Sequence, residues 1–272
     1  HNRTLQMIGG KLLPILGKKL VAKIDHDTLR NAIRKSFPTA SGFNLCLRSI
    51  SPCFKMALVE GWADENPCKR IAKIDTGRRE IQILDIDQCR ALFRACRDYR
   101  EDKTLKEYRR VDCRGAKAAF ALMLFAGVRP NETTRLDWAD IEMGEGTVRV
   151  SNLKAKTDRS RFIDLPPVLK AWLKSVPLGD RSGPLVPSSW KRVYALVREK
   201  AGISDERDIL RKTFATAHLA HFKDVNETRS ILGHEAGDVL FQHYRGLMRP
   251  KEAAQLWKLY PGTENAKMEV VA

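Results

Sequence analysis

Polar and apolar residues follow a helical period through residues 1–70. An apolar stripe begins at Leu5, and residues three to four positions apart share one face of a helix. A second, shorter helix is predicted over residues 27–36, because Asp25 or Asp27 suits the N-cap position. The pattern predicts an all-helical region at this end of the chain.

A longer helix is predicted over residues 42–61, after a loop at residues 38–41. Arg48 and Lys55 lie on the polar faces of this helix. Its apolar positions have near-helical spacing and are Leu45, Ile50, Phe54 and Leu58. Gly61 suits the helix end, since glycine readily adopts the conformation that terminates a helix.

A polar and basic stretch separates this region from the rest of the chain. The residue before Pro67 is disfavoured in a helix. Residues 71–84 are rich in charged side chains and close with a short extended segment at residues 81–84. We interpret residues 71–84 as a linker between two domains.

A helix buried on all sides is predicted at the centre of the second domain. Residues 112–126 are apolar nearly all round, which is typical of a central helix, and Gly127 is placed to end it in a left-handed conformation. A preceding helix is expected to begin after Asp85 or Asp87, which both suit an N-cap, and to run to about Tyr99.

One pair of strands interrupts the helices. Residues 147–151 and 161–165 alternate between apolar and polar side chains and are joined by a basic turn. Pro166 and Pro167 end the second strand, and a short helix to about residue 175 follows. The fold class predicted from these elements is mainly α with a small antiparallel β-sheet.

The remaining helices carry clear apolar faces. Ser188 or Ser189 is expected to cap a helix. The basic residues of that helix lie on its other faces, accessible to an anion: Lys191, Arg192, Arg198 and Lys200. A final helix is predicted over residues 251–260, and its apolar stripe suits packing on its own domain or on a neighbouring subunit. The expected organisation is a helical domain at 1–70, a linker at 71–84, a mixed α+β domain at 85–261 and a flexible tail at 262–272.

The charge of the chain favours a polyanionic partner. Lys and Arg number 49 against 33 Asp and Glu, a formal net charge of +16 spread along 272 residues. A folded basic surface of this kind attracts nucleic acid. We expect no membrane partner, because the sequence has no basic amphipathic anchor and no apolar run of about 20 residues. With no secretory signal visible, a cytoplasmic protein is expected.

The six cysteines are expected to be free thiols. They show no CxxC pair and no histidine at ligand spacing. Most of them fall within apolar helical patterns, where cysteine behaves as a small hydrophobe. We therefore expect a reducing compartment, no zinc site and no cofactor.

Candidate chemistry is spread along the second domain, at Arg129, Lys156, Arg211, His234 and Tyr244. Arginine binds phosphate through two parallel hydrogen bonds. A lysine with a lowered pKa can protonate a departing oxygen, and a tyrosine hydroxyl can act as a nucleophile. Each residue alone also fits an ordinary structural or solvated role, and Lys154 competes with Lys156. Their order along the chain is the discriminating feature.

That order resembles the tyrosine recombinases, the phage-integrase family of site-specific DNA recombinases. AGVRPNE is similar to the family's first arginine box, with Arg129 as its arginine and Glu132 as its acid. KTDRSR resembles the β-hairpin lysine motif and favours Lys156 over Lys154. NPCKRI resembles the end of the family's core-binding domain. ILRKTFAT, LGH and QHYRGL resemble the boxes that contain Arg211, His234 and Tyr244.

The resemblance implies an enzyme that cuts and rejoins double-stranded DNA without metal or ATP. Tyr244 would form a 3′-phosphotyrosyl bond, Lys156 would protonate the leaving 5′ oxygen, and the two arginines with His234 would stabilise the phosphate. Residues 1–70 would be the core DNA-binding domain and residues 85–261 the catalytic domain of a homotetramer on paired DNA sites. Further DNA contacts are expected from Arg48, Lys55, Lys154, Arg161, Lys191 and Arg192.

One position departs from the family pattern. The second arginine box usually opens with histidine or lysine three residues before its arginine, where this chain has Asp208. An aspartate there could position Arg211 or His234 through a charge-assisted hydrogen bond. Two other functions therefore stand beside the recombinase. One is a DNA-binding regulator of the same fold with impaired chemistry, and the other is a type IB topoisomerase, which needs no pairing of DNA sites.

Overall fold

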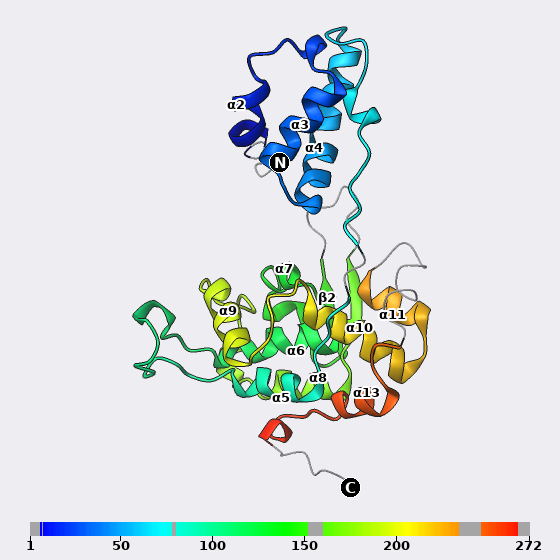
Figure 1. Ribbon diagram of the computed structural model, residues 1–272. Coiled ribbons are helices and arrows are strands. Elements are labelled where there is room, and N and C mark those ends of the chain that lie inside the picture. Colours follow the sequence, from blue (N-terminus) through cyan, green and yellow to red (C-terminus); the bar gives the residue numbers. More distant parts are fainter. Residues whose placement is uncertain (1–5, 7, 78–79, 152–159, 234–245, 266–272) are drawn as a thin grey trace. The chain divides into compact units, whose positions relative to one another are not determined.

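The computed structural model describes residues 6, 8–77, 80–151, 160–233 and 246–265. It divides into two compact units, His1–Glu80 and Ile81–Ala272 (Figure 1). Buried apolar side chains form a separate core in each unit. Among the helices that the structure describes, none is both long and apolar enough to cross a membrane.

The N-terminal unit is helical. Asp25 caps the helix that begins at His26 by accepting a hydrogen bond from the Thr28 N–H at 2.7 Å, so the first of the two candidate caps is the one used. The elements of the unit are a short π-helix η1 (Ile8–Leu12), α2 (Leu13–Leu16), a 3₁₀ turn η2 (Val21–Lys23), α3 (His26–Ser36), α4 (Ala40–Val59) and a 3₁₀ turn η3 (Pro67–Arg70).

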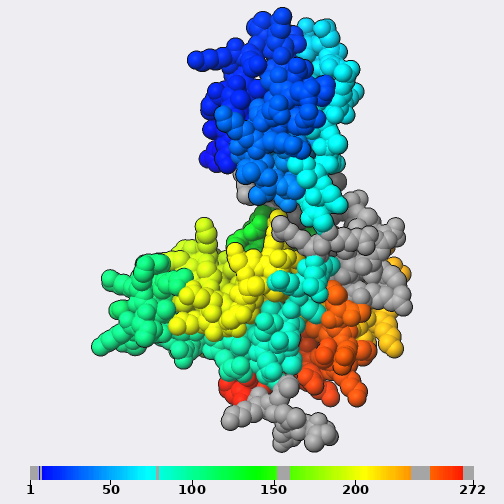
Figure 2. All heavy atoms as spheres, in the orientation of Figure 1, coloured from blue at the N-terminus to red at the C-terminus, as the bar shows by residue number. Residues whose placement is uncertain are grey.

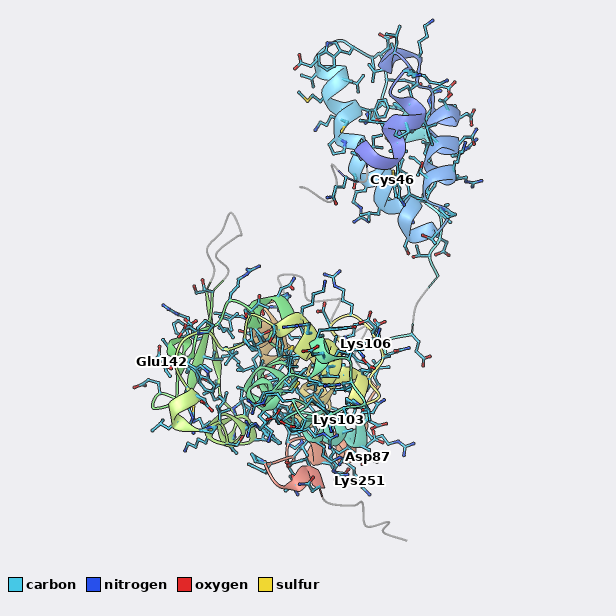
Figure 3. The ribbon with its side chains drawn as sticks, turned by 90° about the vertical axis from the view of Figure 1, so that its left-hand side faces the viewer. Cys46, Asp87, Lys103, Lys106, Glu142 and Lys251 are labelled. Atoms are coloured by element: carbon cyan, nitrogen blue, oxygen red, sulfur yellow. The ribbon has the colours of Figure 1, made fainter. Side chains whose placement is uncertain are left out.

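Helix α4 begins earlier than predicted and turns a different face to the core. The Thr39 hydroxyl accepts from the Gly42 N–H, so the loop expected at residues 38–41 is partly helical. Leu45, predicted to be buried, is 46% exposed, because the core stripe runs through Cys46 and Leu47 instead. Figure 3 places Cys46 among the helices of this unit. The buried positions of α4 are Phe43, Cys46, Leu47, Ile50, Phe54 and Ala57.

The C-terminal unit is built around α6 (Lys117–Phe125), whose residues from Ala118 onward are all buried. The helix packs between α8 and α10 (Figure 1). The other described α-helices of the C-terminal unit are α5 (Ile86–Arg94), α7 (Pro130–Thr133), α8 (Pro167–Lys174), α9 (Trp190–Lys200), α10 (Ile209–Phe222), α11 (Val225–Leu232) and α13 (Pro250–Leu256). Short 3₁₀ turns lie at η4 (Glu107–Arg109), η5 (Arg114–Ala116), η6 (Trp138–Asp140), η7 (Leu178–Asp180) and η8 (Thr263–Asn265).

A small antiparallel sheet completes this unit, in the strand order β1-β2-β3. Its strands are β1 (Ile141–Glu142), β2 (Thr147–Val150) and β3 (Arg161–Asp164), with Val148 opposite Ile163. The two-residue β1 was not predicted, because two residues show no periodicity. The predicted fold class, mainly α with a small antiparallel β-sheet, is confirmed.

Three helices, α5, α6 and α13, are shorter than the sequence predicts. Helix α5 ends at Arg94 rather than near Tyr99, because the chain turns outward and pairs Asp98 with Asp112 in a β-bridge. The segment between α5 and α6 projects from the side of the unit in Figure 2. Helix α6 begins at Lys117 rather than residue 112, after the turn η5.

One expectation about surface residues was wrong, and one alternative is decided. Arg198 on α9 is 7% exposed and donates to Asp205 at 3.3 Å, so it is a buried residue rather than one accessible to an anion. Helix α13 ends at Leu256 and packs against α10 of its own unit, where Ala253 is fully buried. Of the two partners considered for its apolar stripe, its own domain and a neighbouring subunit, the structure shows the first.

Candidate nucleic-acid site

Helix α6 ends in a tight turn against α10 and α11. Gly127 has φ +60°, a left-handed conformation that glycine adopts without steric cost. A Cβ added there would lie 2.5 Å from the Phe214 ring and 2.9 Å from a Leu232 methyl group, so the close packing also requires glycine. The Gly127 carbonyl accepts a hydrogen bond from the Arg211 guanidinium. The turn thereby ties the first arginine box to the second.

Arg129 follows this turn and stands at the N-cap of α7. Its backbone N–H donates to Glu132 Oε2 at 2.8 Å, and its Nη1 donates to Glu132 Oε1 at 2.9 Å. The Arg129 side chain is 37% exposed, whereas that of Glu132 is only 6% exposed. A buried carboxylate therefore orients a guanidinium that still reaches the surface.

Glu132 is shared with Arg161, the first residue of β3. Arg161 donates from Nη1 to Oε1 at 3.1 Å and from Nη2 to Oε2 at 2.8 Å. Burial by itself would raise the pKa of Glu132, but the hydrogen bonds from Arg161 and from the Arg129 N–H outweigh burial and lower the pKa to about 2. Glu132 is therefore a firmly ionised anion between two arginines.

Arg211 lies in the first turn of α10 and is 6% exposed. Its guanidinium donates to the carbonyls of Gly127 and Leu232. Burial, and then the nearby charge of Arg129, lower the pKa of Arg211 to about 9, which leaves it protonated at neutral pH. We call Arg129, Glu132, Arg161 and Arg211 the arginine cluster. With three guanidinium groups against one carboxylate, the cluster favours an anion such as a phosphate.

Two arginines of the cluster hold the C-terminus of α11. Arg161 Nε donates to the Ile231 carbonyl at 3.0 Å, and Arg211 donates to the next carbonyl, that of Leu232. Cations are favourable at the carbonyl end of a helix. Gly233, with φ +62°, then ends the helix. The cluster therefore fixes the C-terminal end of α11.

Asp208 precedes α10 in a left-handed conformation, with φ 56°. Its side chain is 36% exposed and lies 3.5 Å from Arg207 Nε. Its charge favours the protonated form of Arg211, opposing the effect of burial on the pKa of that arginine. Asp208, Arg207 and Arg129 belong to the lining of a hollow of about 420 Å³ on this face.

The other predicted site residues fall into two groups. Lys154, Lys156, His234 and Tyr244 lie outside the described residues. Arg48 and Lys55 on α4, and Lys191 and Arg192 on α9, are exposed, and Arg192 also donates to the Tyr108 carbonyl at 3.2 Å. The structure thus brings Arg129, Arg161, Arg211 and Asp208 to one region, with the remaining described candidates on the surfaces of α4 and α9.

Arg161 has partners that the sequence did not predict. It was expected to bind DNA, yet it is 14% exposed and contacts Glu132 and the end of α11. The three-residue spacing of Arg129 and Glu132 is a local signal for a pair at a helix start. The spacing between Arg161 and Glu132 has no such local meaning, so only the fold brings them together.

The model of the phage integrase family matches residues 82–250, a range that contains the whole arginine cluster. The chain belongs to the phage integrase family. The resemblance noted from the sequence is thus confirmed. A curated relative, tyrosine recombinase XerA of Saccharolobus solfataricus, is 26% identical over 160 residues, which make up 58% of this chain and 50% of the relative. The match therefore spans half the length of that relative.

Solved structures of integrases share the fold. A lambda integrase dimer bound to a COC′ core site matches with a TM-score of 0.68 at 18% identity, covering 91% of this chain and 89% of that one. The Tn1549 transposon integrase in complex with circular intermediate DNA matches with a TM-score of 0.65 at 13% identity, covering 94% and 91% of the two chains. At these identities the likeness is one of fold.

Proposed function

We propose that this protein is a site-specific DNA recombinase that cuts and rejoins double-stranded DNA through a covalent tyrosyl intermediate. The observation that carries the proposal is the arginine cluster, in which Arg211 donates to the carbonyl of Gly127, two residues before Arg129, although the two arginines are far apart in the sequence. Such a pair of rigidly held cations suits the nonbridging oxygens of a phosphodiester. Membership of the phage integrase family supports the same reaction.

In the proposed reaction the Tyr244 oxygen attacks the scissile phosphorus. A bond forms between that oxygen and phosphorus as the bond from phosphorus to the 5′ oxygen breaks. The phenolic proton passes to a nearby base, and Lys156 donates a proton to the leaving 5′ oxygen. Arg129, Arg211 and His234 stabilise the charge on the phosphate. Because the phosphotyrosyl bond conserves the energy of the broken one, the reverse attack by a 5′ hydroxyl reseals DNA without ATP.

Both units would bind DNA. Residues 1–70 would form the core DNA-binding domain, residues 71–84 the linker, residues 85–261 the catalytic domain and residues 262–272 a tail. The net charge of +16 supports contacts with the DNA backbone. We assign backbone contacts to Arg48, Lys55, Lys154, Lys191 and Arg192. Strand exchange between two sites would need a homotetramer, and a solved lambda integrase structure is a tetramer bound to a Holliday junction.

The test is covalent capture on a nicked suicide substrate that carries the element's own attachment site. Wild-type protein should give a protein–DNA band on a denaturing gel, and Tyr244→Phe should bind the same DNA without giving that band. Binding without any band from wild type would favour the DNA-binding regulator. A covalent band together with relaxation of supercoiled plasmid, but no joint molecules between two sites, would favour the topoisomerase.

A further inference from the structure

Arg161 joins three separate parts of the C-terminal unit. Two of its nitrogens meet the Glu132 carboxylate, at 3.1 and 2.8 Å, and its Nε meets the Ile231 carbonyl at 3.0 Å. These contacts connect the first residue of β3 to Glu132 in α7 and to Ile231 near the end of α11. All three nitrogens of the guanidinium donate within the protein, so the group is poorly placed to serve as a DNA ligand.

The carboxylate of Glu132 is fully used by this arrangement. It accepts from Arg161 twice, from the Arg129 backbone N–H and from Arg129 Nη1, and a carboxylate offers about four acceptor sites. Because Arg161 takes one position on each oxygen, Arg129 contacts the carboxylate through a single nitrogen of its guanidinium. The rest of the Arg129 guanidinium remains directed toward the surface, where its side chain is 37% exposed.

We propose that Arg161 is a positioning residue for phosphate cleavage, an inference that rests on the function proposed above. Arg161 keeps Glu132 from pairing with Arg129 through both nitrogens, and so leaves Arg129 available to a phosphate. It also holds the end of α11, beside the carbonyl that Arg211 holds. Arg161 acts on the scissile phosphate through its neighbours and does not touch it.

Lysine cannot reproduce this role. A single ammonium is a point charge on a flexible stem, whereas the planar guanidinium bridges a carboxylate and a third acceptor at fixed angles. Loss of the bridge would allow Arg129 to close onto Glu132. A displacement of about 1 Å in a group that binds the transition state lowers the rate of an enzymatic step roughly 100-fold.

The test compares Arg161→Gln and Arg161→Lys with wild type on the nicked substrate. The matched control is Arg149→Gln, because Arg149 lies on the neighbouring strand β2 and pairs with Asp140 at 3.2 Å while 55% exposed. We expect both Arg161 variants to bind DNA within about threefold of wild type. We expect the rate constant for cleavage at saturating protein to fall about 100-fold for Arg161→Gln and about tenfold or more for Arg161→Lys. The control should cleave at the wild-type rate.

A second substrate tests whether Arg161 acts through Arg129 or on the leaving 5′ oxygen. Sulfur in place of the bridging 5′ oxygen gives a leaving group that needs no proton. Since Arg161 acts through Arg129, its variants should remain equally slow on this substrate. In a double-mutant cycle with Glu132→Gln, the two losses should be far from additive, because both residues act through one contact.

Three results would overturn the proposal. The first is a cleavage rate of Arg161→Gln equal to that of the control. The second is rescue by the bridging sulfur, which would place the effect on the leaving group. The third is a loss of DNA affinity as large as the loss of rate, which would make Arg161 a DNA-binding residue. Absence of a covalent band from wild type itself would instead refute the proposed function. If Arg161→Gln does not fold, the cleavage rate of Arg161→Lys is compared with that of the control instead.

Discussion

The guanidinium of Arg161 forms two parallel hydrogen bonds with the carboxylate of Glu132, across 29 positions of sequence. Both side chains are largely withdrawn from solvent, with 14% and 6% of their surfaces exposed. A buried pair of this kind contributes little net stability compared with apolar residues, but removal of one partner is costly. Its consequence is the fixed placement of Arg129 and of the end of α11.

Glu132 makes the stability of the C-terminal unit sensitive to acid. Its pKa of about 2 lies below the ordinary value of 4.5, so its contribution is complete above pH 4.5 and is lost as the pH falls toward 2. The shift corresponds to about 3 kcal/mol of unfolding free energy. We expect Glu132→Gln to remove this part of the pH dependence in urea melts, and to lower stability at pH 7 by about 3–5 kcal/mol.

The control for this experiment is Glu142→Gln, because Glu142 is exposed on strand β1 and is labelled at the edge of the unit in Figure 3. It should leave the acid profile of wild type unchanged. An equal acid sensitivity in wild type and Glu132→Gln would show that Glu132 is not the group responsible.

Gly127→Ala should strongly destabilise the protein. The added Cβ would overlap the Phe214 ring at 2.5 Å and a Leu232 methyl group at 2.9 Å, in a residue with φ +60°. We expect a loss of about 2–4 kcal/mol, from overpacking together with backbone strain. Gly183→Ala is the matched control, since φ is +68° there and an added Cβ meets no described atom within 4 Å. It should cost only about 1–2 kcal/mol of strain, and equal losses for the two variants in thermal melts would exclude the packing contribution.

Protonation of His218 should make the stability of the C-terminal unit depend on pH in a second range, closer to neutral than that of Glu132. Burial lowers its pKa to about 4, and its Nδ1 lies 2.8 Å from the Thr228 hydroxyl. The unfolded chain therefore binds a proton more readily than the folded one, so stability is complete above pH 6.5 and falls by about 3 kcal/mol as the pH drops to 4. Urea melts of His218→Gln should lack this slope. The exposed neighbour on the same helix, in the variant His221→Gln, should retain it, and a slope that survives in His218→Gln would contradict the assignment.

Asp208→Asn should strengthen DNA binding. Asp208 lines the same hollow as Arg129, where its negative charge opposes an incoming phosphate, and asparagine tolerates the left-handed backbone at this position. We expect a two- to fivefold gain in affinity at low salt, on the order of 0.5–1 kcal/mol for one charge near the surface. The rate constant for cleavage by the bound protein should stay within about threefold of wild type.

Asp180→Asn, which removes one exposed charge from the turn η7, provides the comparison for Asp208→Asn. It should leave DNA affinity close to that of wild type. A collapse of cleavage in Asp208→Asn, with binding intact, would instead support a direct role for the aspartate in positioning Arg211 or His234.

Local signals in the sequence were sufficient for several elements. The apolar run of α6 and its end at Gly127 were predicted and are confirmed. Two candidates were predicted for each of two caps, and the first of each pair, Asp25 and Asp85, is the one used. Each depends on residues within one or two turns of each other. Helical periodicity, capping hydrogen bonds and the left-handed freedom of glycine are properties of such short stretches, so they can be read before any tertiary contact is known.

Tertiary structure alone decided which charged residues are withdrawn from solvent and which face of α4 is buried. Arg161 and Arg198 carry the same side chain as the exposed Arg48, and nothing in their local sequence separates the three. Arg161 is buried against a carboxylate and a carbonyl that lie 29 and 70 positions away in the sequence. Arg198 is buried next to the segment that follows its own helix, where it donates to Asp205 and to the Glu206 carbonyl. In both cases the fold brings in partners that lower the cost of removing a guanidinium from water. The order of the family's motifs thus identified the family, while the pairing of Arg161 with Glu132 required the fold.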